Sequence, residues 1–85
     1  MSVQETSREA YQSVLPEMSD RKREVVRVVQ THGTLCNRDI AALTGRPINE
    51  ITPTVLSLRE DGVLTLSHKG IYELTGRRVM FWKVA

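Results

Sequence analysis

The chain has 85 residues, of which 40% are hydrophobic and 26% charged, so we expect one small domain with a limited core. No apolar run approaches the roughly 20 residues that a membrane span needs, which excludes a transmembrane protein. The single cysteine cannot form an internal disulfide, and the first 18 residues lack the basic, apolar character of a secretion signal, so we expect a reduced, intracellular protein.

Charge is distributed unevenly along the chain. Residues 1–18 carry one basic and three acidic side chains, a net charge of −2, whereas residues 19–85 carry eleven basic and seven acidic ones, a net charge of +4. We therefore divide the chain into an N-terminal segment, residues 1–18, and one domain, residues 19–85. The basic excess of the domain favours a polyanionic partner, with a merely solvated surface as the alternative.

The N-terminal segment contains the sequence "TSREAYQSVL", which predicts a short helix. Thr6 and Glu9 have the spacing of a capping box, and Pro16 ends the pattern. One apolar stripe at helical spacing is formed by Ala10, Tyr11, Val14 and Leu15. We expect this stripe to pack on the domain or to pair with a second copy of the chain, forming a homodimer.

The next segment, "SDRKREVVRVVQTHG", predicts a helix that begins at a cap on Ser19 or Asp20 and ends at Gly33. Valine is only a fair helix former, but the length and the caps favour a helix over a strand. The side chains expected to face inward are Val25, Val26, Val28 and Val29. The apolar "TLC" at 34–36 has the composition of a short additional strand.

Two helices follow with only a short turn between them. "NRDIAALTG" predicts a helix that is capped by Cys36 or Asn37 and stops at Gly45. "NEITPTVLSLREDG" predicts a second helix at about 49–61, starting either at a cap on Asn49 or at Thr52. Its buried stripe, at positions i, i+4 and i+7, is formed by Ile51, Val55 and Leu58.

Beyond Gly62 the hydrophobic pattern changes to that of strands. "VLTLS" and "RRVMFWKV" are apolar and β-branched, and the "HKG" and "TG" between them are turn signals. We therefore expect a β-hairpin at about 63–84 with a long tip at roughly 68–76. Trp82 is expected in the core, because so small a domain has few other large apolar groups.

The order of these elements predicts a mainly α fold with a small β-hairpin. Two helices joined by a turn of about four residues containing glycine form a helix-turn-helix unit. The stretch "NRDIAALTGRPINEITPTVLSLREDGVL", followed by "TGRRVMFWKV", resembles winged helix-turn-helix domains, in particular small ones of bacteriophages and prophages. The resemblance implies a three-helix core plus a wing, with the N-terminal helix as an addition.

The resemblance also implies binding of double-stranded DNA by a transcriptional or replication-linked regulator, in the cytoplasm of a bacterial or phage-infected cell. The helix at about 49–61 would lie in the major groove and the wing on the DNA backbone. The residues expected to read bases are Asn49, Thr52, Thr54 and Ser57. The residues expected to contact phosphates are Arg38, Arg46, Lys69, Arg77 and Arg78.

The outward face of the presumed reading helix departs from the usual pattern. Similar sequences often carry arginine after the proline, where this chain has Thr54, and the outward positions hold neither lysine nor arginine. Arginine to guanine, the commonest specific contact, is thus missing. A protein-interaction module on the same scaffold, without sequence-specific DNA binding, is the alternative function.

Catalytic, cofactor and metal sites are not expected. His32, Cys36 and His68 are potential metal ligands, but Gly33 breaks the helix between the first two and no compact second pair exists. Cys36 would need a histidine base and an orienting group to act as a nucleophile, and nothing completes that site. We therefore expect a binding protein rather than an enzyme.

Overall fold

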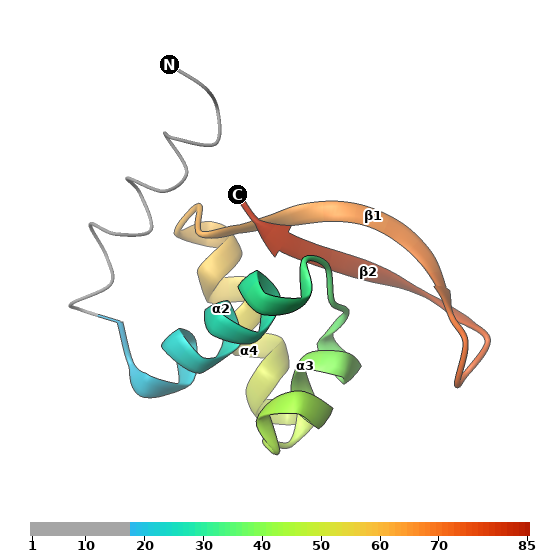
Figure 1. The fold of residues 1–85 in the computed structure, drawn as a ribbon, viewed down its shortest axis with the longest axis horizontal. Coiled ribbons are helices and arrows are strands. Elements are labelled where there is room, and N and C mark those ends of the chain that lie inside the picture. The colour runs from blue at the N-terminus through green and yellow to red at the C-terminus, as the bar shows by residue number, and fades with distance from the viewer. Residues whose placement is uncertain (1–17) are drawn as a thin grey trace.

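The computed structural model describes residues 18–85. Three helices, α2 (Asp20–His32), α3 (Asn37–Thr44) and α4 (Ile48–Glu60), are followed by two strands, β1 (Leu64–Tyr72) and β2 (Arg77–Val84). The helices pack against one another, and the two antiparallel strands extend from them as one curved hairpin (Figure 1). The helix predicted for the N-terminal segment lies outside the described residues. Met18, the one residue of that segment that is described, contributes to the core.

Helix α2 confirms the prediction from its caps and valines. The Ser19 hydroxyl accepts a hydrogen bond from the Lys22 backbone N–H at 3.3 Å, and Gly33 ends the helix with a φ of 91°. The fully buried side chains of the helix are Val25, Val26 and Val29, with Val28 partly buried beside them. Tertiary packing therefore outweighs the modest helix propensity of valine.

The segment after α2 pairs with the second strand of the hairpin, as the short apolar "TLC" suggested. Leu35 and Trp82 exchange two backbone hydrogen bonds, of 3.0 Å and 2.8 Å. This bridge ties the start of the helix-turn-helix unit to the base of the hairpin. It therefore sets where the hairpin leaves the helical body.

Helices α3 and α4 form the predicted pair. Gly45 adopts a φ of 72°, a left-handed conformation that ends α3. Helix α4 begins at Ile48, with Pro47 as its N-cap residue. The two predicted starts, a cap on Asn49 and a first residue at Thr52, are therefore both wrong. The predicted inward stripe is confirmed, since all three of its side chains are at most 1% exposed: Ile51, Val55 and Leu58.

The hairpin differs from the prediction in its tip. The expected loop at 68–76 is mostly strand: pairing continues to Tyr72 and Arg77, and only residues 73–76 form the turn. Gly70 is not a turn residue, because it pairs with Val79 in the hairpin. A Cβ at Gly70 would lie 3.2 Å from the ring of Phe81. The glycine gives room to that ring, which stacks on His68 with the ring centres 4.7 Å apart.

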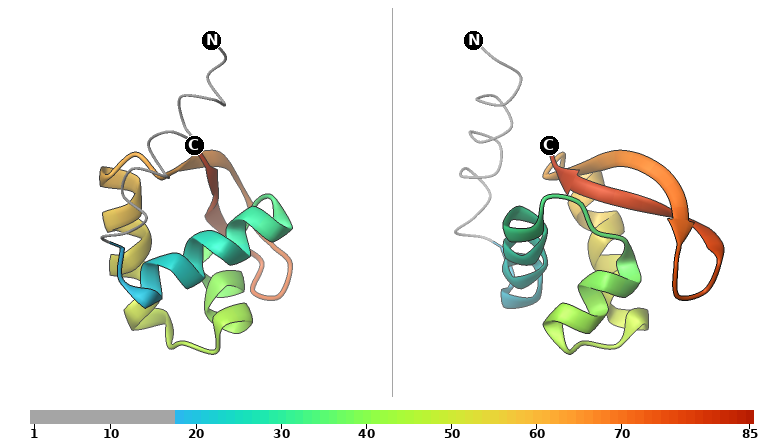
Figure 2. Two further views of the ribbon diagram at one scale, coloured as in Figure 1. Left: turned by 60° about the vertical axis from the view of Figure 1, so that its left-hand side comes forward. Right: turned by 45° about the vertical axis from the view of Figure 1, so that its right-hand side comes forward.

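The core lies where the three helices meet the base of the hairpin. Trp82, only 4% exposed, belongs to it as predicted, together with Val63 and Leu64 at the start of the hairpin. The distal half of the hairpin projects away from the helices, most clearly in the right-hand view of Figure 2. Within residues 18–85, no helix is long and apolar enough to cross a membrane.

Candidate nucleic-acid interface

One exposed line along α4 combines polar and apolar side chains and has no cation on it. Asn49, Pro53 and Leu56 are exposed and follow one another at i, i+4 and i+7, so they lie on one line along the helix. Thr52 is exposed beside this line, and Leu56 is 52% exposed. The helix has a single basic residue, Arg59, and its guanidinium carbon lies 5.3 Å from the centre of the Trp82 ring.

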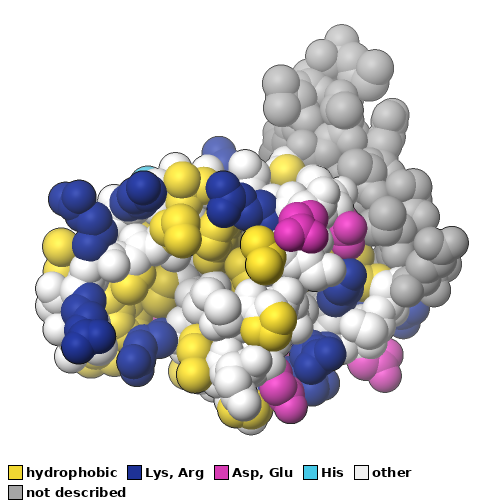
Figure 3. All heavy atoms as spheres, turned by 180° about the vertical axis from the view of Figure 1, so that it is seen from behind, with side chains coloured by type: hydrophobic (Ala, Val, Ile, Leu, Met, Phe, Trp, Pro, Cys, Tyr) yellow, Lys and Arg dark blue, Asp and Glu magenta, His cyan; other side chains and the backbone are white. Residues whose placement is uncertain are grey.

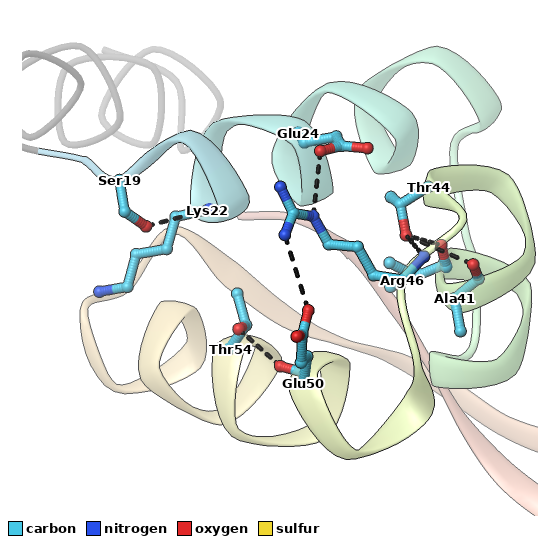
Figure 4. Close-up of polar contacts among 9 residues, drawn as sticks. Ser19, Lys22, Glu24, Ala41, Thr44, Arg46, Glu50 and Thr54 are labelled. Atoms are coloured by element: carbon cyan, nitrogen blue, oxygen red, sulfur yellow. Dashed lines mark hydrogen bonds and ion pairs between the residues drawn. The ribbon is translucent and has the colours of Figure 1, made fainter.

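Thr54 does not lie on this outward face, and the prediction that placed it there is wrong. Its side chain is only 5% exposed and donates a hydrogen bond of 2.7 Å to the Glu50 carbonyl of the preceding turn (Figure 4). This bond satisfies the hydroxyl inside the helix, which allows a polar side chain to be buried. Ser57 is half-buried, at the edge of the outward face.

Arg46, which the sequence analysis expects to contact a phosphate, takes part in two ion pairs. Its Nε lies 3.1 Å from the Glu24 carboxylate, and its Nη1 lies 3.6 Å from the Glu50 carboxylate (Figure 4). Its side chain is 33% exposed. Arg46 therefore links α2, the turn and α4, and its charge is already balanced by two carboxylates.

The other four predicted phosphate contacts are exposed. Within residues 18–85, none of them takes part in an ion pair: Arg38, Lys69, Arg77 and Arg78. Figure 3 shows lysine and arginine side chains gathered on the side where the hairpin projects, whereas acidic side chains lie over the middle and the opposite side. The hairpin is therefore the cationic part of this face.

Trp82 fixes the hairpin relative to α3. Its indole N–H donates a hydrogen bond of 2.9 Å to the Asn37 side-chain oxygen at the start of α3, while its backbone pairs with Leu35. The sequence analysis did not assign Asn37 this role. A buried tryptophan needs a partner for its N–H, but the sequence does not indicate which of many polar residues supplies it.

A hollow of about 240 Å³ lies between the start of α3 and strand β2. Its lining residues are Cys36, Asn37, Arg38, Val79, Met80 and Trp82. Desolvation and the Asp39 carboxyl raise the pKa of the Tyr72 hydroxyl above its usual value.

The residues considered for catalysis and metal binding do not gather in one place. Within residues 18–85, no three His, Cys, Asp or Glu side chains are grouped to hold a metal ion. Cys36 is 1% exposed, and burial raises the pKa of its thiol. A buried, protonated thiol is a poor nucleophile, so Cys36 has a structural role at the start of α3.

Two solved structures resemble the chain. One is NadR in complex with 4-hydroxyphenylacetate, with a TM-score of 0.65, 20% identity, and coverage of 94% of this chain and 52% of that one. The other is the transcriptional regulator PA4135, with a TM-score of 0.63, 15% identity, and coverage of 96% and 59%.

The chain spans between about half and three fifths of the length of these two proteins. No protein-family model matches it, and no curated protein matches it significantly. At these identities the likeness concerns the fold. Three helices with a two-stranded antiparallel hairpin, matched to these structures, confirm the predicted winged helix-turn-helix fold.

Proposed function

We propose that this chain binds double-stranded DNA as a transcriptional regulator, with α4 in the major groove and the hairpin on the DNA backbone. The observation that carries the proposal is the pairing of two surfaces. A helix face of polar and apolar side chains lies beside a hairpin whose exposed cations are not balanced by carboxylates within residues 18–85. The first is suited to base edges and the second to phosphates.

The division of labour follows from the chemistry of the side chains. Asn49 and Thr52 on α4 are the base-reading residues of the proposal, with Ser57 at the edge. The phosphate contacts come from outside α4: Arg38, Lys69, Arg77 and Arg78. PA4135 has a similar fold and is described as a transcriptional regulator, which supports a regulatory role for this chain. Three further parts of the proposal are supported by the sequence resemblance alone. These are a phage origin, a cytoplasmic location and a role linked to replication.

A homodimer is the arrangement in which such a domain would reach two half-sites. Winged-helix and related regulators bind symmetric operators as dimers when an additional element pairs the two copies. In this chain the apolar stripe of residues 10–15 is the proposed pairing element. Deleting residues 1–17 should then reduce the dimer fraction in sedimentation, and an unchanged fraction would remove the stripe from this role.

A protein-interaction module is the second candidate function, and the outward face of α4 favours it. Ile48 and Leu56 are 44% and 52% exposed, and the one basic residue of α4, Arg59, lies over the ring of Trp82. Exposed apolar side chains on a helix are suited to a protein groove as well as to a DNA groove. A protein-interaction module would leave the cations of the hairpin without a specific role.

Salt dependence separates the two functions. We would first select bound sequences from random duplexes, then measure the affinity by fluorescence anisotropy at several salt concentrations. Each neutralised phosphate contributes about −0.9 to the slope of log K against log salt, so the four cations that form no ion pair within residues 18–85 predict a slope of about −3.6. No binding at low salt, or binding that does not weaken with salt, would favour the protein-interaction module.

A further inference from the structure

We propose that α4 recognises the 5-methyl groups of thymines, so that the chain prefers A·T-rich major grooves through apolar contacts rather than through arginine–guanine pairs. This inference rests on the proposed DNA-binding function and specifies what the site reads. It follows from the composition of the exposed line along α4, in which an amide is followed by two apolar side chains.

The apolar groups of this face are placed where a groove would meet them. Pro53 and Leu56 lie on the same line as Asn49, and the methyl group of Thr52 is exposed beside them. The core lies on the opposite side of the helix, since Ile51 and Leu58 are fully buried. A Leu that is 52% exposed contributes little to the core, so its apolar surface is available for a ligand.

The thymine methyl is the one apolar group that the major groove presents. Adenine, guanine and cytosine offer only donors and acceptors there, whereas thymine adds a C5-methyl group. A neutral apolar surface therefore has one favourable partner in the groove. Arg59, the only basic side chain of α4, lies over the ring of Trp82. No arginine of this helix is therefore positioned to bind guanine in the way that the commonest specific contact requires.

Polar groups on the same face match the adenine of the pair. The Asn49 side chain can bond the N6 and N7 atoms of adenine with its two ends.

Glu60 limits which part of α4 enters the groove. It lies on the same line one turn beyond Leu56, and it is exposed. A carboxylate repels phosphates, so the C-terminal end of the helix would stay outside the groove. The recognised methyl groups are therefore those that face the first two turns and Leu56.

The test compares a selected duplex with a twin in which deoxyuridine replaces every thymine of the bound site. Deoxyuridine lacks only the methyl group and keeps all hydrogen-bonding groups. Wild-type protein should bind the twin more weakly, by roughly fourfold for each methyl group in contact, the factor that corresponds to burying one carbon. Both duplexes are titrated at one salt concentration, so that the phosphate contribution is the same.

Two variants locate the contact on the protein. Leu56→Ala should reduce the thymine-to-deoxyuridine preference while changing the affinity for the deoxyuridine twin by less than about twofold. Thr52→Ser removes one methyl group and keeps the hydroxyl, so it should lower the same ratio by a smaller factor. Leu74→Ala is the matched control: this leucine is 85% exposed in the hairpin turn, and its loss should leave the ratio unchanged.

Three results would overturn the inference. Equal affinity of wild type for the two duplexes would show that α4 does not read thymine methyl groups, while DNA binding itself stands. Equal loss on both duplexes in Leu56→Ala would assign Leu56 to folding or to a protein contact. Absence of any duplex binding at low salt would overturn the proposed function and this inference with it.

Discussion

The helical body and the hairpin differ in whether their basic side chains form ion pairs. All three ion pairs found within residues 18–85 link parts of the helical body: Lys22 with Asp61, and Arg46 with Glu24 and Glu50. Over the same residues, the basic side chains of the hairpin form no ion pair: Lys69, Arg77, Arg78 and Lys83. Two cations of the body, Lys22 and Arg46, thus hold helices together, whereas the cations of the hairpin are presented to solvent.

The two parts also differ in how they are held. The helical body packs valine, isoleucine and leucine side chains that are at most 1% exposed, whereas the far half of the hairpin has mostly exposed or half-buried residues. Only the base of the hairpin enters the core, through Trp82 and Leu64. Substitutions in the body should therefore change stability, and substitutions in the distal hairpin should change binding.

The largest expected effect is on the core of the body. Leu58→Ala removes a fully buried side chain and should lower the free energy of unfolding by about 2–5 kcal/mol, a large part of the stability of so small a domain. Chemical denaturation followed by circular dichroism measures this. Leu74→Ala in the exposed hairpin turn is the control, and a similar loss in both variants would break the contrast between the two parts.

The junction between the two parts comes next. Asn37→Ala leaves the indole N–H of Trp82 buried without its partner and should lower the free energy of unfolding by about 1–3 kcal/mol. Tryptophan fluorescence should report a changed environment of Trp82 in the folded variant. Unchanged stability together with unchanged fluorescence would show that this hydrogen bond does not hold the hairpin on α3.

Removal of a hairpin cation should change binding without changing stability. Arg77→Ala and Arg78→Ala should each weaken binding to all duplexes similarly, and each should reduce the salt slope by about 0.9. Their unfolding midpoints should stay near that of wild type, because both side chains are exposed. A sequence-dependent loss would instead make them base contacts; an unchanged slope would leave them as solubilising charges.

The smallest expected effect is the loss of an ion-paired cation. Arg46→Ala should lower the free energy of unfolding by about 0.2–1 kcal/mol for each exposed pair, since its partners are also partly solvated. It should leave the salt slope of DNA binding near the wild-type value. A slope reduced as much as by Arg77→Ala would show that Arg46 exchanges its carboxylates for a phosphate on binding.

Several features could be predicted from local sequence because local chemistry determines them. The Ser19 cap and the positive φ of Gly33 and Gly45 set the ends of α2 and α3. The stripe of Ile51, Val55 and Leu58 identified the buried side of α4. The burial of Thr54 follows the same periodicity, because this residue lies three residues after Ile51 and four before Leu58, although a polar side chain usually indicates exposure.

Other features depended on residues far apart in the chain. Glu24 is 22 residues from Arg46, and Asn37 is 45 residues from Trp82, so neither contact has a local signal. In the hairpin, Gly70 looks like a turn residue in the sequence, but it makes room for the ring of Phe81 on the opposite strand. A glycine permits both a turn and a close approach, and only its neighbours decide which one forms.

The sequence by itself determined the order of the elements, their inward faces and the excess of cations in residues 19–85. The tertiary structure decided which of those cations are available. Folding brings two carboxylates to Arg46, while Arg77 and Arg78 stay exposed on a hairpin that leaves the body. Periodicity and capping act within a few residues along the chain, whereas ion pairing depends on distances in space that only the packed fold sets.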